Sequence, residues 1–442
     1  MTAVPTLALL APLSPVHGLL GAGLAVAAGF AILRLPSFEK GASVRATCAL
    51  TAALHAGFLA LGIHAVGPDG IHLGALESDP LAFHLLHAVP LLGTLGFAAV
   101  AVLPRLIQVN LALLIALGLG VETVLGLMPP PWPIAEGEPE PVDARSYYEF
   151  DEVLSYVVSP AVTARHRSMV DGEVAYDVTY RIDSLGRRET PGTGGRSSDR
   201  FLLFFGDSNT FGEGLNQEET LPAAVASMAG DSHPYNYGMH GYGPTQALDL
   251  LDVRDLASEV AERRGIAIYT FIPAHMGRVV GSSQVAPVWG KGFSYYELGA
   301  AGEPVRLGSF FRARPLRTLA QHYWNRSNIL SRFGLVLPLR YGDGDFVLTA
   351  RILRTVADRL QPLFEEVDFY VVMAPVSTAD QAETVVRLKK ALEAEQVPVI
   401  DLSGIVDFSE RRWRVADDDW HHSGALNRVL AEALVERLSL GK

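Results

Sequence analysis

The sequence predicts a transmembrane bundle of four helices followed by an α/β domain built on a parallel sheet. Four apolar runs of about 20 residues fill the first 128 residues, which is the length that a bilayer-spanning helix needs. From residue 201 onward, short apolar segments typical of buried strands alternate with longer helical segments. Such an alternation indicates a parallel sheet with helices on both of its faces.

The four apolar runs are the strongest feature of the N-terminal part. A helix rises 1.5 Å per residue, so each run is long enough to cross a hydrocarbon core of about 30 Å. No basic segment precedes the first run, and we therefore do not expect a cleaved signal peptide. Glu122 lies inside the fourth run, where an ionised carboxylate is costly unless it faces the bundle or reaches the outer end. The runs cover residues 16–35, 46–66, 81–103 and 106–128.

The loops between these runs predict the orientation of the bundle. The first and third loops carry the basic residues Arg34, Lys40, Arg45 and Arg105. The second loop carries Asp69, Glu77 and Asp79 and has no basic residue. The positive-inside rule places the basic loops in the cytoplasm, so both termini are expected outside it. We therefore expect a multi-pass protein of the cytoplasmic (inner) membrane, with its C-terminal domain in the periplasm or at the cell exterior.

Charge is unevenly distributed along the chain. The formal net charge is −12, but residues 1–128 hold only four Lys or Arg and five Asp or Glu. The remainder is therefore an acidic domain, which argues against a nucleic-acid partner. Cys48 is the only cysteine and lies in an apolar run, so no intrachain disulfide can form.

Two segments separate the bundle from the α/β domain. Residues 129–145 are rich in proline and acidic residues, and we expect an extended, semi-rigid linker. Residues 146–199 predict a short β-rich lead-in with a strand over 174–182. The α/β domain itself is expected to span residues 200–442.

The α/β domain has five expected strands and six expected helices. The strands lie at 201–205, 235–237, 266–272, 368–373 and 397–401. The helices lie at 218–229, 244–263, 313–333, 345–366, 377–395 and 422–439. The segment 284–310, with scattered glycines and aromatic residues, is typical of a hairpin insertion.

One stretch organises this domain. Five consecutive apolar residues, 201–205, suit a strand buried on both faces, and Gly206-Asp207-Ser208 follows directly. Open α/β sheets place their functional sites at the carboxyl ends of their strands, which is where this serine lies. A helical turn that begins at Ser208 would direct free N–H groups at whatever the hydroxyl attacks. Taken alone, Gly-Asp-Ser also fits an ordinary turn.

Three motifs in order give this part of the chain a family resemblance. The stretch 201–214 resembles the first conserved block of the SGNH (GDSL-type) hydrolase superfamily, and Asn236–Gly243 resembles the second. Asp418–His421 resembles the Asp-x-x-His block near the C-terminus. The resemblance covers a little over half of the chain. It implies a flavodoxin-like three-layer αβα fold and serine-dependent ester chemistry through an acyl-serine, without a metal or cofactor.

The resemblance implies a catalytic triad. Ser208 would be the nucleophile, and the base and its carboxylate partner would come from the Asp-x-x-His block. Two pairings fit the sequence, namely Asp418 with His421 and Asp419 with His422. The run His-x-Ser-x-x-Leu-Asn that begins at His421 favours the first pairing.

The resemblance also implies an oxyanion hole with three donors. Two would be the backbone N–H groups of Ser208 and of a glycine in the second block, Gly241 with Gly238 as the alternative. The third is an asparagine in the family, but residues 273–278 contain none, and His275 occupies about that position. An imidazole N–H can donate to an oxyanion, so we expect His275 to replace the amide. The change also fits a domain that binds without turnover.

The resemblance implies a substrate class as well. Membrane-tethered domains of this superfamily often add or remove acetyl groups on cell-surface polysaccharides. The expected activity is that of a carbohydrate O-acetylesterase or O-acetyltransferase. The expected partners are the lipid bilayer, a polysaccharide or another acylated small substrate, and a membrane acyl-donor protein. The alternative is a non-catalytic polysaccharide-binding or assembly protein that retains the fold.

Overall fold

The computed structural model describes residues 146–170, 173–191, 199–230, 232–417 and 419–441, together with scattered positions between 110 and 142. Three of the apolar runs, and most of the fourth, lie outside these residues. Among the described residues, no helix combines the length and apolarity needed to cross a membrane. The chain divides into two units: Met1–Pro129 with Arg326–Gly334, and Pro130–Asn325 with Leu335–Lys442.

In the first unit, Glu122 contacts the start of a short helix. The backbone N–H of Asn328 donates to Glu122 Oε2 at 2.6 Å, and the Ser327 hydroxyl donates to Oε1. Both groups lie at the N-terminus of α14 (Asn328–Arg332), where free N–H groups and the helix dipole favour an anion. The carboxylate expected to be costly is therefore hydrogen-bonded.

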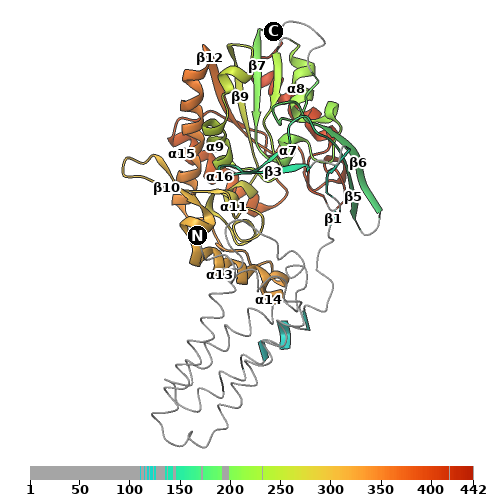
Figure 1. The fold of residues 1–442 in the computed structure, drawn as a ribbon. Coiled ribbons are helices and arrows are strands. Elements are labelled where there is room, and N and C mark those ends of the chain that lie inside the picture. Colours follow the sequence, from blue (N-terminus) through green and yellow to red (C-terminus); the bar gives the residue numbers. More distant parts are fainter. Residues whose placement is uncertain are drawn as a thin grey trace, which may run out of the picture. The chain divides into compact units, whose positions relative to one another are not determined.

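A five-stranded parallel sheet forms the centre of the second unit (Figure 1). Its order is β13-β12-β9-β7-β8. Read from β8 with the strands numbered along the chain, this is 2-1-3-4-5, the order of flavodoxin-like sheets. The prediction of an α/β fold with a parallel sheet is confirmed. The strands are β7 (Arg200–Phe205), β8 (Ser232–Asn236), β9 (Arg264–Phe271), β12 (Glu366–Met373) and β13 (Val399–Asp401).

Helices cover both faces of the sheet, as the apolar sequence of β7 requires. Phe201, Leu203 and Phe205 point to one face, while Leu202 and Phe204 point to the other, and all five are buried. Burying one such side chain contributes about 1.5–3 kcal/mol, so β7 anchors both layers. The first layer holds α9 (Pro244–Val253), α11 (Ala274–Val280), α15 (Asp343–Leu360) and α16 (Ala379–Ala394). The second holds α8 (Leu221–Ala229) and α17 (Gly424–Arg437), and Figure 1 shows α8 and α9 on opposite sides.

Two of the expected long helices are interrupted. The segment 244–263 forms α9 and α10 (Leu256–Glu259), because Arg254 and Asp255 leave the helical conformation between them. The segment 313–333 forms α13 (Pro315–Arg326) and α14, because the Ser327 side chain caps a new helix. The expected hairpin insertion is present as β10 (Ser294–Leu298) and β11 (Pro304–Ser309), followed by α12 (Phe310–Ala313). Short 3₁₀ turns lie at η3 (Gln217–Glu219), η4 (Gln361–Leu363) and η5 (Arg411–Trp413).

The β-rich lead-in belongs to the same unit as the parallel sheet. An antiparallel sheet contains β1 (Ala135–Glu136), β2 (Glu140–Pro141), β5 (Thr163–Val170) and β6 (Glu173–Arg181). A separate hairpin contains β3 (Tyr148–Asp151) and β4 (Ser155–Val158). Part of the segment expected as a linker, 129–145, therefore pairs with β5. A bridge between Arg188 and Asn236 joins the end of the lead-in to the edge strand β8.

Candidate active site

Ser208 is presented by a sharp turn at the end of β7. Gly206 has a φ of +152°, and a Cβ there would clash with the Thr210 side chain, so the turn requires glycine. The short helix α7 (Ser208–Phe211) begins directly afterwards, with Asp207 as its N-cap accepting from the Asn209 N–H at 3.0 Å. The serine therefore lies at the carboxyl edge of the sheet, beside the point where the strand order reverses.

A continuous chain of hydrogen bonds runs from Ser208 to a carboxylate. His421 Nε2 lies 2.8 Å from Ser208 Oγ, and His421 Nδ1 lies 2.5 Å from Asp419 Oδ1. Asp419 Oδ1 also accepts from the backbone N–H of His421 at 3.0 Å, which fixes the ring relative to its own backbone. Because a carboxylate only accepts hydrogen bonds, Nδ1 carries the proton and a neutral ring has its lone pair on Nε2. This is the arrangement that activates a serine hydroxyl.

The structure brings together the predicted serine and the predicted histidine, but with a different carboxylate. Asp419, which the sequence paired with His422, is the residue on His421 Nδ1, and Asp418 lies outside the described residues. The alternative pair does not form. The His422 ring packs edge-on against Phe408, its backbone N–H donates to Asn209 Oδ1 at 3.0 Å, and burial lowers its pKa to about 4.

Two backbone N–H groups are available for an oxyanion. Among the described residues, neither the Ser208 N–H nor the Gly241 N–H has a hydrogen-bond acceptor. Gly241 has a φ of +74°, and a Cβ there would lie 2.5 Å from the Tyr156 hydroxyl and 2.8 Å from the Trp289 ring. The alternative, Gly238, donates its N–H to Asn236 Oδ1 at 2.9 Å and is therefore occupied. The geometry favours Gly241, as the sequence analysis expected.

His275 does not contribute to this oxyanion site, and its expected role is wrong. The side chain is fully buried, with Nδ1 2.9 Å from the Tyr269 hydroxyl and Nε2 3.3 Å from Asp207 Oδ2. The ring is thus held inside the domain by Tyr269, and Nε2 lies beside Asp207 without a well-aligned hydrogen bond. The physical reason is Asp207, whose buried carboxylate needs hydrogen-bond donors.

Asp207 is stabilised chiefly by an arginine. Arg278 Nη1 donates to Asp207 Oδ2 at 3.0 Å and to the carbonyl of Tyr242 at 2.6 Å. Burial raises the pKa of Asp207, but the charge of Arg278 and the contact with His275 outweigh it and hold the pKa well below its usual range. Burial lowers the pKa of His275 to about 4 in spite of the neighbouring carboxylate. His275 is therefore neutral at physiological pH.

Two residues that the sequence analysis did not single out complete the site. Glu213, just after α7, places Oε2 2.7 Å from His240 Nδ1 and 3.5 Å from His421 Nε2. His240 comes from the loop after β8, and its ring packs against Phe211 at 4.1 Å between centroids. The signal available in the sequence was their position, because both lie in the same two motifs as Ser208 and Gly241.

The lead-in holds His240 in place. The Tyr147 hydroxyl lies 3.4 Å from His240 Nε2, and the Tyr156 hydroxyl donates to the His240 carbonyl at 2.7 Å. Tyr147 belongs to the segment just before β3, and Tyr156 to β4. The lead-in hairpin is therefore part of the site and not merely a connection to it.

The carboxylates set the charge state of His421. Burial lowers the pKa of His421, but the charge of Glu213 and the hydrogen bond to Asp419 outweigh it and raise the pKa to about 9. Burial raises the pKa of Glu213, but attraction to His421 and His240 holds it well below its usual range. The free site therefore favours a protonated His421 beside an ionised Glu213.

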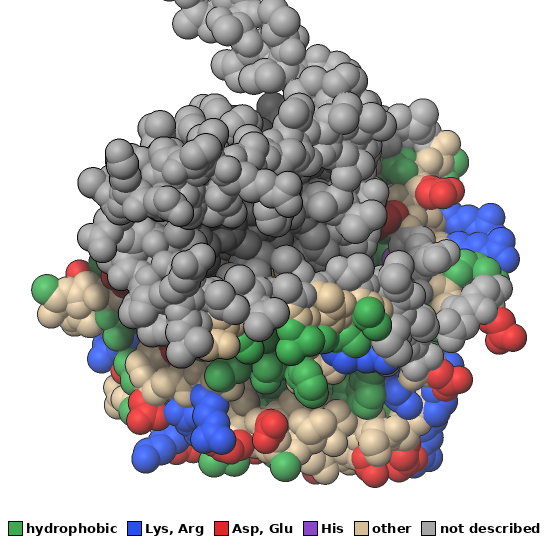
Figure 2. Space-filling model, turned by 90° about the horizontal axis from the view of Figure 1, so that it is seen from below, with side chains coloured by type: hydrophobic (Ala, Val, Ile, Leu, Met, Phe, Trp, Pro, Cys, Tyr) green, Lys and Arg blue, Asp and Glu red, His purple; other side chains and the backbone are tan. Residues whose placement is uncertain are grey.

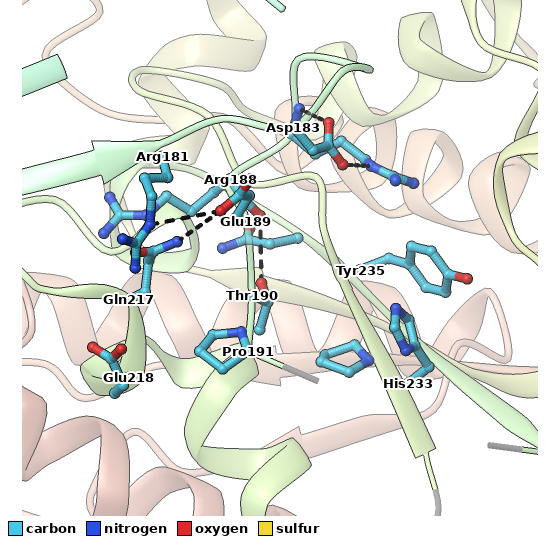
Figure 3. A pocket seen from close by; sticks show the side chains of 13 residues that line it. Arg181, Asp183, Arg188, Glu189, Thr190, Pro191, Gln217, Glu218, His233 and Tyr235 are labelled. Carbon is cyan, nitrogen blue, oxygen red and sulfur yellow. Dashed lines mark hydrogen bonds and ion pairs between the residues drawn. The ribbon is translucent and has the colours of Figure 1, made fainter. Parts of the chain in front are cut away.

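Arg187 and Arg278 both contact carboxylates, those of Asp183 and Asp207. Arg187 Nε contacts Asp183 Oδ2 at 2.7 Å, on the rim of a hollow of about 460 Å³. Figure 3 shows Arg181 and Gln217 of this hollow directed at Glu189. Positive and negative side chains balance there, so the hollow has no excess charge to attract an anion. Among the described residues, no group of three or more His, Cys, Asp and Glu side chains could hold a metal ion.

The solved structures similar to this chain share little sequence with it. Neither the protein-family models nor the curated proteins give a match. Among solved structures, an acetylxylan esterase from Geobacillus stearothermophilus is 13% identical, with 55% of this chain and 95% of that chain covered and a TM-score of 0.32. A putative SGNH hydrolase from Slackia heliotrinireducens is 10% identical, with 55% and 100% covered and a TM-score of 0.31. A putative lipolytic protein of the G-D-S-L family from Desulfitobacterium hafniense is 12% identical, with 53% and 98% covered and a TM-score of 0.28.

Proposed function

We propose that the chain is a serine-dependent ester hydrolase or acyl transferase that works through an acyl-Ser208 intermediate. The observation that carries the proposal is the continuous chain from Ser208 Oγ through the His421 ring to Asp419. Ser208 Oγ attacks the ester carbonyl while His421 Nε2 takes its proton. The N–H groups of Ser208 and Gly241 stabilise the oxyanion. His421 then protonates the leaving alcohol.

The surroundings of Gly241 support a carbohydrate ester as the substrate. Trp289 is 41% exposed, and it lies beside both Gly241 and the guanidinium of Arg278. An exposed indole next to the oxyanion site offers an apolar face against which a sugar ring can stack. We therefore propose O-acetyl groups on a cell-surface or extracellular polysaccharide as the ester.

The proposed location follows from the N-terminal sequence. Four apolar runs and basic first and third loops support a multi-pass protein of the cytoplasmic membrane with the site outside the cytoplasm. The bilayer is then a partner, and a membrane acyl donor would be needed for transfer. The described part of the face in Figure 2 carries both signs of charge interspersed, which supports the proposal that no nucleic acid binds. A reporter active only in the periplasm, fused at Lys442, should be active.

A non-catalytic role in polysaccharide binding or assembly is the second candidate. One observation favours it: His275 is engaged with Asp207 and Tyr269, so the oxyanion is left with two backbone donors. Removing one side-chain donor from an oxyanion site typically costs about 10²–10³ in rate. The complete chain of hydrogen bonds at Ser208 favours the enzyme.

Acetate release separates the two candidates. The full chain, purified in detergent, is incubated with an O-acetylated polysaccharide and with 4-nitrophenyl acetate. The hydrolase proposal expects acetate from both substrates with the wild type and none above background with Ser208→Ala. Equal binding of the polysaccharide by both proteins, with no acetate from either, would establish the binding role.

A further inference from the structure

His421 has a carboxylate on each of its two ring nitrogens. Asp419 occupies Nδ1, as in other triads, while Glu213 lies 3.5 Å from Nε2, the nitrogen that exchanges protons with Ser208. Nothing in the acylation step uses a carboxylate at that position. Glu213 is 20% exposed at its side chain, so a small molecule can reach it.

The position of Glu213 is fixed relative to the nucleophile. The Glu213 N–H donates to the Ser208 carbonyl at 2.9 Å, and the next N–H, that of Gly214, donates to the Tyr180 hydroxyl at 2.9 Å. At the other end, His240 Nδ1–H holds the carboxylate oxygen Oε2 at 2.7 Å. Within the described part of the chain, Oε1 accepts no hydrogen bond. The carboxylate is thus held at both ends and retains a free acceptor.

The second half of the reaction places a molecule at this point. Deacylation requires a neutral His421, because the group that attacks the acyl carbon must donate its proton to Nε2. It therefore lies within hydrogen-bond distance of Nε2, and a carboxylate 3.5 Å from that nitrogen is within reach of the same molecule. Water has two O–H donors and can serve Nε2 and Glu213 together. An alcohol has one, so its oxygen faces the carboxylate with a lone pair.

From this geometry we infer that Glu213 orients the deacylating water and excludes alcohol acceptors, so that the acyl group goes to water. The inference rests on the proposed acyl-Ser208 and decides between hydrolysis and transfer. Water gives one proton to His421 Nε2, its oxygen forms a bond to the acyl carbon, and the bond from that carbon to Ser208 Oγ breaks. His421 returns the proton to Ser208, and the carboxylic acid leaves. His240 positions Glu213 for this step.

The partition of the acyl group between water and an alcohol tests the inference. The full chain is acylated with 4-nitrophenyl acetate in buffer that contains ethanol, and acetate and ethyl acetate are measured. Glu213→Gln supplies an amide N–H that can donate to the oxygen of an alcohol. We expect this variant to raise the ratio of ethyl acetate to acetate about 10-fold or more, which is the effect of losing a hydrogen bond to a charged group. Deacylation by water should become slower for the same reason. Glu218→Gln, an exposed glutamate on η3, is the matched control and should keep the wild-type ratio.

Other variants separate this inference from related possibilities. Glu213→Asp keeps a carboxylate, so its ratio should stay within about threefold of wild type even where the rates fall. An unchanged ratio in Glu213→Gln, with acylation intact, would overturn the inference and leave the proposed hydrolase standing. Faster deacylation by water in Glu213→Gln would also overturn the inference. Glu213 would then only keep His421 protonated and unable to act as a base. Absence of any 4-nitrophenol release by the wild type would instead refute the acyl-Ser208 on which the inference rests.

Discussion

Two histidines on opposite sides of Asp207–Ser208 contact carboxylates and have opposite charge behaviour. His421, in front of Ser208, contacts Asp419 and Glu213, keeps 25% of its side chain exposed, and has a pKa raised to about 9. His275, behind it, contacts Asp207, is fully buried, and has a pKa lowered to about 4. Burial lowers the pKa of both histidines, but Glu213 and Asp419 together outweigh it at His421, whereas Asp207 does not outweigh it at His275, where the charge of Arg278 lowers the pKa further. A nearby carboxylate therefore does not by itself make a histidine a base. The ring must also be accessible to the substrate, and the negative charge beside it must not be balanced by a cation.

Substitution of His421 should have the largest effect. His421→Ala should lower kcat/KM toward a small acetyl ester by about 10⁴-fold, because the base and proton donor are lost together. His275→Ala should change kcat less than about tenfold, because that ring does not reach the reacting atoms. Steady-state kinetics of both variants compare the two regions directly. A loss of activity in His275→Ala equal to that in His421→Ala, in a folded protein, would contradict the assignment.

The next effect concerns the carboxylate on His421 Nδ1. Asp419→Asn should lower kcat by about 10³–10⁴-fold, since an amide no longer fixes the tautomer or stabilises the imidazolium. Asp418→Asn is the neighbouring control and should leave kcat within about threefold of wild type. If Asp418→Asn had the larger effect, the pair inferred from the Asp-x-x-His block would be restored.

Behind the nucleophile, the expected effect is on stability. Arg278→Met leaves the fully buried Asp207 without its main partner, and loss of one member of a buried ion pair costs about 3–5 kcal/mol. Urea unfolding followed by tryptophan fluorescence should show this loss. Arg165→Met, in an exposed pair with Asp177, is the control and should differ from wild type only slightly. A loss as small in Arg278→Met as in the control would show that Asp207 does not depend on the arginine.

The pH dependence of stability should be the smallest effect and has opposite signs for the two histidines. Because the folded pKa of His421 is raised to about 9, its contribution is present below its unfolded pKa of about 6.5 and is lost as pH rises through 9. Because the folded pKa of His275 is lowered to about 4, its contribution is present above about 6.5 and is lost as pH falls through 4. Each shift corresponds to roughly 3 kcal/mol.

Melting temperatures between pH 4 and 9 check these signs. His421→Gln should lose less stability than wild type on the alkaline side, and His275→Gln should lose less on the acid side. The raised pKa of His421 also predicts that kcat/KM rises with pH toward about 9, since His421 must be neutral to act as the base. An unchanged alkaline slope in His421→Gln would show that Glu213 and Asp419 do not raise the pKa of that histidine.

The sequence predicted those features that depend on local pattern. Five apolar residues followed by Gly-Asp-Ser predicted the strand β7 and a helical turn that begins at Ser208. The structure contains both. The order of the strands also follows the expected fold. The partner of His421 could not be predicted, because the choice between two adjacent aspartates depends on the turn that lets Asp419 reach both N and Nδ1.

Features that depend on contacts between distant segments were missed. The direction of His275 depends on Asp207, a residue 68 positions earlier whose burial no local pattern reveals. The pair of Glu213 and His240 forms across two loops and is held by Tyr147 from the lead-in. Part of the proline-rich segment pairs with β5, because composition indicates an extended chain but not its partner.

Covalent labelling of Ser208 tests the central claim most directly. A fluorophosphonate reacts only with a serine whose hydroxyl is activated by a neighbouring base. Intact-mass measurement of the full chain should show one adduct on the wild type, located at Ser208 by peptide mapping, and none on Ser208→Ala or His421→Ala. An unlabelled but folded wild-type protein, or equal labelling of Ser208→Ala, would contradict the account.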